Sequence, residues 1–240
     1  MVSDMMQGNP IPWRFQDAND GVDNVLPYDP RRAKIRYGSR LTQSEIGCFY
    51  SHYSCMKDFA ESDSSFDYLL VLEDDVWIDK RFSFSSIPKI MSWLDMHFLV
   101  LYSRRMKRAS FLGSIGHRSL FRFSVTPFGG QAYVVSKAGA RKIVNSIQRI
   151  DRPFDNEMEM YWINGLPTYA LFPYPVIELN FCSTVAKGYA AGEKLSLLTQ
   201  LQRFAYRSQN KSRRILGHLF LLQSDRRIRR LLHRKDMPRG

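Results

Sequence analysis

Three consecutive carboxylates, Glu73, Asp74 and Asp75, are the sharpest chemical signal in the sequence. They directly follow a short apolar run at residues 68–72, and adjacent negative charges repel, so a cation is expected beside them. Mg²⁺ and Mn²⁺ take oxygen ligands, commonly one or two carboxylates together with substrate phosphates. Because alternate side chains of an extended segment point the same way, Glu73 and Asp75 can share one metal site. The alternative is an exposed acidic turn, or a carboxylate that caps the following segment.

A second group of carboxylates, Asp155, Glu157 and Glu159, follows Arg152 and Pro153. A carboxylate in a cleft can act as general base for an acceptor hydroxyl. The alternative is an acidic first helical turn, which interacts favourably with the helix dipole. Both interpretations stay open at this point.

Other residue types with possible chemistry give weaker signals. His52 shares a predicted helix face with Cys48 and Cys55, where a packing histidine is the expected role. Gly129 and Gly130 permit a ligand to approach the backbone closely, but two glycines before a strand can also form a simple turn. The five histidines lack the spacing of a zinc site, and the chain has no G-x-S-x-G elbow, P-loop or G-x-G-x-x-G motif.

The elements that must position these residues alternate between helix and strand, which predicts an α/β fold. A capping-box pattern at Thr42 and Glu45 marks the start of the first long helix. The continuous apolar run 68–72 is typical of a strand buried on both faces, as in a parallel sheet. Residues 1–40 are expected to be irregular and residues 104–118 to form a basic loop. Helices are predicted at 42–62, 87–94, 136–147 and 154–163, and strands at 68–72, 97–102, 131–135 and 168–172.

The composition is that of an ordinary globular protein. The chain has 240 residues, of which 44% are hydrophobic and 24% charged, and this excludes wholesale disorder, collagen and a coiled coil. It has no run of about eighteen apolar residues and no apolar secretory signal at its start. The three cysteines, Cys48, Cys55 and Cys182, are expected to be small buried hydrophobes in a reducing cytosol.

The positive charge is concentrated at the C-terminus. Residues 203–240 contain twelve Lys/Arg and two Asp/Glu, a net charge of +10 out of +12 for the whole chain. Basic amphipathic helices of this kind often lie on anionic membranes, and the alternative is a solvated helix packed on its own domain. Nucleic-acid binding is disfavoured because the segment lacks a recognisable module. The apolar positions group into two predicted helices, with Leu195, Leu198 and Leu201 in one and Ile215, Leu219 and Leu222 in the other, followed by Ile228, Leu231 and Leu232 among arginines.

Five segments together resemble glycosyltransferase family 25, the lipooligosaccharide galactosyltransferases of bacterial surface-glycan synthesis. The resemblance covers roughly residues 13–185. Residues 41–52 (LTQSEIGCFYSH) are similar to the family's GE-x-GC-x-x-SH segment, and residues 70–76 (LVLEDDV) to its LEDDV motif. Weaker similarities are residues 130–140 to G-x-x-Y-x-x-S-x-x-A, residues 152–155 to P-x-D, and residues 13–18 to F-x-D-A.

The resemblance implies a GT-A fold, which is assigned to residues 1–194. The charge and the apolar spacing predict a basic amphipathic helical tail at residues 195–240. It implies transfer of a sugar, most often from UDP-galactose, to a hydroxyl of a lipid-linked surface glycan by an inverting single displacement. Such an enzyme is expected in the cytoplasm, held by its tail on the inner face of the bacterial inner membrane.

The resemblance also implies roles for individual residues. Asp75 and Glu73 would ligate Mn²⁺ or Mg²⁺, and Glu73 and Asp74 would help hold the nucleotide-sugar. Asp155 would be the general base, with Glu157 in reserve. Positions expected to shape the substrate cleft are Glu45, Ser51, His52 and Gln131.

Two features depart from the family pattern. Family members usually open with a strand containing I-N-L, whereas this chain begins inside or after the helix that follows, so either its start is truncated or its donor site is incomplete. Ser44 stands where the family usually has glycine. The first departure motivates an alternative function, a degenerate, non-catalytic family member that binds a glycan or a partner enzyme.

Overall fold

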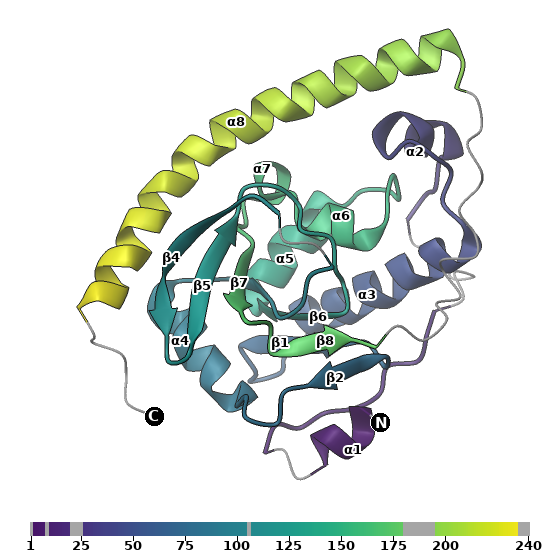
Figure 1. Cartoon of the computed structure of the whole chain (residues 1–240). Helices are drawn as coiled ribbons and strands as arrows, with labels where there is room; N and C mark the ends of the chain where they lie inside the picture. The colour runs from purple at the N-terminus through teal and green to yellow at the C-terminus, as the bar shows by residue number, and fades with distance from the viewer. Residues whose placement is uncertain (1, 8–9, 20–25, 105–106, 180–194, 235–240) are drawn as a thin grey trace.

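The computed structural model describes residues 2–7, 10–19, 26–104, 107–179 and 195–234, and it has a mixed α/β architecture (Figure 1). The central sheet has six strands in the order β1-β6-β3-β7-β5-β4. In this sheet β3 and β7 pair in parallel, and the other described pairs are antiparallel. The strands are β1 (Tyr68–Leu72), β3 (Phe98–Val100), β4 (Ala109–Ile115), β5 (Arg118–Phe123), β6 (Ala132–Ser136) and β7 (Tyr169–Phe172).

A second, two-stranded sheet lies beside the first and pairs β2 (Val76–Ile78) with β8 (Val176–Glu178) in antiparallel fashion. The predicted α/β class is confirmed. The helices are α1 (Val2–Met6), α2 (Pro30–Arg36), α3 (Gln43–Glu61), α4 (Ile87–Leu94), α5 (Lys137–Ser146), α6 (Phe154–Met158), α7 (Tyr161–Asn164) and α8 (Leu197–His233), with a 3₁₀ turn η1 (Phe84–Ser86) before α4.

Two apolar clusters cover the two faces of the central sheet. Helices α3 and α5 pack on one face, where Phe49, Phe98 and Tyr133 are completely buried. Helix α4 packs on the other face, where Met91 and Leu99 are completely buried. Burial of such side chains is the main stabilising contribution to a domain of this size.

The structure explains the apolar run of β1. Leu69 and Val71 pack against the first cluster, while Tyr68, Leu70 and Leu72 pack against the second, so both faces are covered. The predicted strand is confirmed, but the predicted parallel pairing is wrong. β1 lies at the edge of the sheet and pairs antiparallel with β6.

Helix α3 begins with the predicted capping box. Glu45 N donates to Thr42 Oγ1 at 3.1 Å, and Thr42 N donates to Glu45 Oε2 at 2.8 Å. The helix ends at Glu61, as predicted to within a residue. Its inward face includes His52, which brings this side chain to the end of β1.

We expect Thr42→Ala to lower the free energy of unfolding by about 1 kcal/mol, because the first turn loses its side-chain acceptor. Thr42→Ser, which keeps the hydroxyl, is the matched control and should stay close to wild type. Urea unfolding measures both variants. An equal loss of unfolding free energy in Thr42→Ser would show that the threonine methyl group, and not the capping hydroxyl, supplies the stability.

Residues 104–118 were predicted to be a loop, and this prediction is wrong. They contain β4, which forms a hairpin with β5 through a turn at Gly116, where φ is +57°. The register shifts between Phe111 and Gly113, so the alternation of buried and exposed residues that marks a strand is interrupted. Residues 1–40 were predicted to be irregular but contain α1 and α2.

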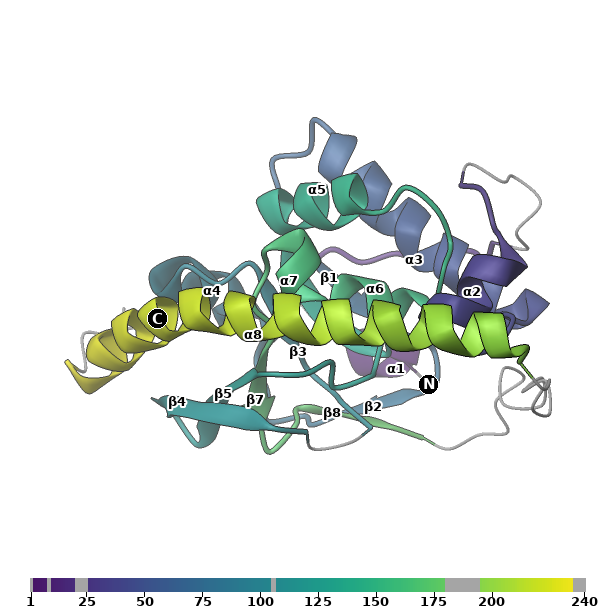
Figure 2. The same ribbon diagram turned by 90° about the horizontal axis from the view of Figure 1, so that it is seen from above.

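The C-terminal segment forms one helix of 37 residues instead of the two predicted helices. Helix α8 runs along the body from α2, past α7, to β4 (Figure 2). Ile228 is buried in the second cluster, and Leu231 and Leu232 pack against it. Arg122 of β5 donates two hydrogen bonds to Asp225 of α8, at 2.6 and 2.7 Å, in a buried ion pair.

The cysteines do not all behave as predicted. Cys48 is exposed and Cys55 is half-buried, so the prediction of buried thiols is wrong for Cys48. Cys182 lies outside the described residues. In the described part of the chain, the helices are all too short or too polar to cross a membrane.

Candidate active site

The predicted site residues gather at one edge of the central sheet. β1 and β3 both run antiparallel to β6, so their carboxyl ends meet at the same edge. There Glu73 N donates to Gln131 O at 2.8 Å, which joins the acidic segment to the start of β6. In open α/β sheets, ligands bind beyond the carboxyl ends of the strands.

His52 links helix α3 to this edge. Its Nδ1 lies 3.1 Å from the Tyr133 hydroxyl, and its Nε2 lies 3.3 Å from Glu73 Oε1. The imidazole is buried and stacks on Phe154, with 5.4 Å between the ring centroids. Val71 opposes Tyr133 in the β1–β6 ladder, so strand pairing brings Tyr133 and Glu73 to opposite sides of the same imidazole.

The environment of His52 favours its protonated form. Burial lowers its pKa, but Cys48 and Glu73 outweigh burial and raise the pKa to about 10. An imidazolium donates hydrogen bonds from both nitrogens, so His52 holds the Glu73 carboxylate in place. The sequence indicates that His52 packs against its neighbours, and the structure adds a contact that orients the carboxylate of Glu73.

Asp75 lies in a crowded acidic cluster. Its Oδ1 is buried and has no hydrogen-bond partner among the described residues. Burial, and after it the nearby charges of Glu73, Glu178 and Asp74, together raise the pKa of Asp75 to about 6. Asp74 is exposed, and it lies with Asp75 in a turn between β1 and β2, so the alternation of an extended segment does not hold there.

Glu178, at the end of β8, completes the cluster, and sequence analysis missed it. Arg104 Nε donates to Glu178 Oε2 at 2.9 Å, and Arg104 Nη2 donates to Oε1 of the same carboxylate. Burial raises the pKa of Glu178, but the hydrogen bonds and charge of Arg104 more than offset it, so the pKa is lowered. The Tyr102 hydroxyl donates to Glu178 Oε2 at 3.1 Å, and Gln131 Nε2 donates to Oε1 at 3.4 Å.

The acidic cluster fits a hard divalent cation. A buried carboxylate oxygen without a partner, among like charges, is the arrangement that Mg²⁺ or Mn²⁺ would relieve. A second group consists of ligand atoms of Cys48, His52 and Glu73, all within 4.8 Å of one another, a donor set suited to a softer metal. Metal binding at this second group would require His52 to give up its proton and Cys48 to bind as a thiolate.

Asp155, at the start of α6, lies close to the same edge. Burial raises the pKa of Asp155, while hydrogen bonds from Asn156 and the charges of His52 and Arg104 lower it, and the net shift is upward. Asn156 N and Nδ2 both donate to Asp155 Oδ1, at 2.7 and 2.9 Å. A carboxylate whose pKa is raised is a stronger base than a free one, which suits it to accept a proton.

The other two carboxylates of this segment have partners in the protein. Glu157 Oε1 lies 3.1 Å from Nε of the buried Arg152, without hydrogen-bond alignment, and Arg152 also bonds to Tyr206 of α8. Glu159 is buried, and its Oε2 accepts from Phe128 N at 3.0 Å. Burial raises the pKa of Glu159 well above its ordinary value, as expected for a neutral acid in the interior.

Two predicted substrate residues have structural partners instead. The Glu45 carboxylate closes the capping box of α3. Ser51 Oγ accepts from Asn19 N at 2.8 Å and donates to Gly47 O at 3.0 Å, which attaches the N-terminal segment to α3. A Cβ at residue 47 would lie 2.8 Å from Asn19 O, which explains the need for glycine there.

Comparison with known proteins identifies the family of the chain. A sequence model of the family described as "Glycosyltransferase family 25 (LPS biosynthesis protein)" matches residues 23–158, a range that includes α3, the acidic run 73–75 and Asp155. The chain belongs to glycosyltransferase family 25. Procollagen galactosyltransferase 2 of Homo sapiens is 31% identical over 116 residues. That alignment covers 46% of this chain and 18% of the human protein, so the chain matches less than a fifth of the relative's length.

Proposed function

We propose that this glycosyltransferase moves galactose from UDP-galactose to a hydroxyl of a lipopolysaccharide or related surface glycan. The observation that carries the proposal is the acidic cluster at the carboxyl edge of the sheet, where His52 contacts Glu73 and its charge also acts on Asp155. The galactose donor is supported by the name of the human relative, and the glycan acceptor by the family description. The fold proposed for the catalytic part is of the GT-A type.

In this proposal, the acidic cluster binds the donor. Asp75 and Glu73 hold Mn²⁺ or Mg²⁺, which when bound neutralises the negative charge of the leaving diphosphate. Asp74 is exposed beside them and contacts the nucleotide-sugar. Arg104 is half-exposed at the rim of the cluster, where its guanidinium adds a positive charge within reach of phosphate oxygens.

The acceptor side of the reaction is assigned to Asp155. The carboxylate takes the proton of the acceptor hydroxyl while the oxygen attacks C1 of the sugar from the face opposite the diphosphate. The bond from C1 to the diphosphate oxygen breaks, and UDP leaves. His52 holds Glu73 and its charge limits the rise in the pKa of Asp155, so it is a positioning residue.

Asp155→Asn is expected to lower turnover about 100- to 10,000-fold, because a carboxamide cannot accept the proton. UDP affinity should be unchanged, since the acidic cluster remains intact. Initial rates of UDP release and calorimetric titration of UDP measure the two quantities. Glu157→Gln serves as the competing variant, and we expect it to weaken the contact with Arg152 and affect stability more than turnover. Full activity of Asp155→Asn together with loss of activity in Glu157→Gln would move the base to Glu157.

The overall function is tested by a donor screen in the presence of Mn²⁺. Release of UDP from UDP-galactose, faster than from UDP-glucose or UDP-N-acetylglucosamine and abolished by EDTA, is the expected result. Release from none of these donors would contradict the proposal and favour a non-catalytic protein that binds a glycan or a partner enzyme.

A further inference from the structure

Helix α8 carries an apolar face that is largely exposed in the described part of the chain. Its members, between 40% and 80% exposed, are Leu197, Leu198, Leu201, Phe204, Ile215, Leu216, Leu219, Phe220 and Leu222. An exposed apolar set of this size, gathered on one element, marks an interaction surface. We refer to these nine residues as the outer face of α8.

The outer face is separate from the face that folds onto the protein. At about 100° per residue, Leu201 and Leu219 lie on nearly the same line along the helix, opposite the buried Leu221 and Ile228. The inward residues complete the core, so folding does not require the outer face to be apolar. Of the apolar positions of the basic tail, Ile228, Leu231 and Leu232 pack inward.

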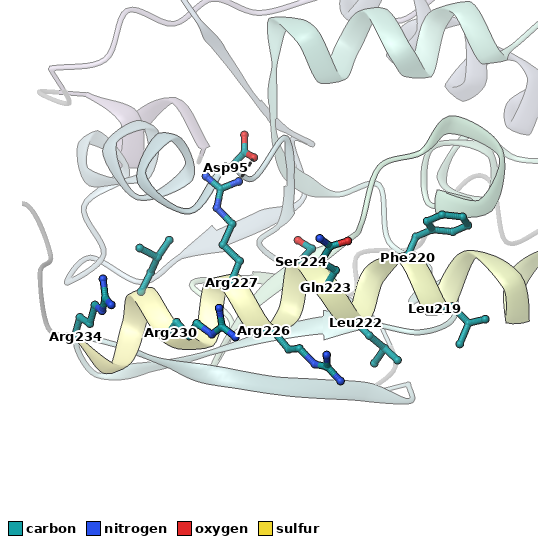
Figure 3. Close-up of a pocket in the computed structure, with 11 residues that line it drawn as sticks. Asp95, Leu219, Phe220, Leu222, Gln223, Ser224, Arg226, Arg227, Arg230 and Arg234 are labelled. Carbon is teal, nitrogen blue, oxygen red and sulfur yellow. Dashed lines mark hydrogen bonds and ion pairs between the residues drawn. The ribbon is translucent and has the colours of Figure 1, made fainter.

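The charge of α8 is almost entirely positive. The helix contains nine Lys/Arg and a single acid, Asp225, which is buried against Arg122. Figure 3 shows the C-terminal half, where Arg227 reaches Asp95 of the body, while Leu219, Leu222 and Arg226 point away from Asp95. Arg226 and Arg230 are exposed and lie in line with the outer face.

We propose that the outer face of α8 docks on an anionic phospholipid surface, with its leucines at the headgroup–acyl boundary and its arginines on lipid phosphates. This combination of exposed leucines flanked by arginines, on a helix that does not span, is characteristic of helices that lie in the membrane interface. The proposal goes beyond the sugar-transfer function and does not depend on it.

Charge disfavours the other occupants. A second copy of α8 would bring two strongly positive helices face to face, which costs free energy through repulsion. A nucleic acid would pair with the arginines but leave the leucines in water, because its outer surface is phosphate. An anionic bilayer offers phosphates to the arginines and an apolar boundary to the leucines.

The test is binding of the full chain to vesicles of phosphatidylcholine alone and of phosphatidylcholine with 30% phosphatidylglycerol. We expect binding to the anionic vesicles, weakened by salt, and little binding to the neutral ones. Leu216→Ser with Leu219→Ser should lower the partition coefficient about tenfold or more, since two leucines no longer insert. Arg226→Gln with Arg230→Gln should lower it about 30-fold on anionic vesicles.

The matched control removes exposed apolar side chains elsewhere. Phe15→Ser with Phe66→Ser replaces two side chains that are 66% and 56% exposed but lie outside α8, and binding should be unchanged. All the substituted positions are exposed, so circular dichroism should show wild-type folding. Absence of binding to anionic vesicles, or an equal loss in the control, would overturn the proposal. So would tighter binding to duplex DNA than to vesicles, or a dimer that the leucine variant dissociates.

Discussion

Replacing Asp75 by asparagine is expected to lower metal-dependent UDP release about 100-fold or more, which corresponds to about 2.7 kcal/mol of transition-state stabilisation. The substitution removes the charge of the side chain whose Oδ1 is buried without a partner. Without that charge, the cluster attracts a divalent cation less strongly, and the charge of the leaving diphosphate is less well neutralised.

The stability of this variant separates a functional loss from misfolding. Asp75 is surrounded by the like charges of Glu73 and Glu178, so neutralising it should leave the free energy of unfolding unchanged or raise it. Asp63→Asn, at an exposed carboxylate in the loop before β1, is the matched control and should keep wild-type activity. Wild-type UDP release by Asp75→Asn would exclude Asp75 from the metal site.

Asp225→Asn is expected to lower the free energy of unfolding by about 3–5 kcal/mol, the usual effect of breaking a buried ion pair by removing one partner. The Arg122 guanidinium is fully buried and would keep its charge without the carboxylate that faces it. Chemical denaturation followed by circular dichroism measures the change.

A surface ion pair between the same two parts of the protein provides the control. Arg227 Nη1 lies 2.8 Å from Asp95 Oδ2, and both side chains are more than half exposed. Arg227→Gln should therefore cost only about 0–1 kcal/mol. The double replacement Arg122→Met with Asp225→Leu should recover most of the stability, because it removes both charges. A small effect of Asp225→Asn would mean that α8 is a detachable tail instead of part of the folded body.

The strongest local patterns predicted their elements well. The capping box at Thr42, the serine cap at Ser136 and the apolar run at residues 68–72 all mark elements within a residue of their observed ends. Each of these signals depends on neighbours in the sequence, such as a side chain reaching a backbone group three residues away. Local patterns of this kind do not determine which strand pairs with which, so the parallel pairing of β1 was wrong.

Elements whose apolar residues do not recur at one regular spacing were predicted incorrectly. The bulge in β4 breaks its alternation, and several charges around residues 104–108 made the segment look like a loop. In α8, the apolar positions 195–201 and 215–222 were assigned to two separate helices, but the residues between them continue a single helix. Helix propensity and composition predict a helix such as α8 poorly, because its apolar residues occupy an exposed face as well as the buried one.

Only part of the site was predicted, because local patterns do not show which distant segments meet. The acidic run 73–75 is local and conspicuous, so its position at the end of a strand could be inferred. Glu178 and Arg104 are about 100 and 30 residues away from that run. The pairing of β2 with β8 brings Glu178 there, and Arg104 reaches the site through its ion pair with Glu178. The His52 contacts with Tyr133 and Glu73 span 81 and 21 residues, a distance that no sequence spacing rule covers.

Calorimetric titration of UDP into the chain, with and without Mn²⁺, is the sharpest test of the donor site. We expect micromolar affinity that requires Mn²⁺ and is lost in Asp75→Asn. Binding of that kind would show that the acidic cluster at the end of β1 is a working donor site. Absence of UDP binding to the folded wild-type chain in the presence of Mn²⁺ would contradict a donor site there.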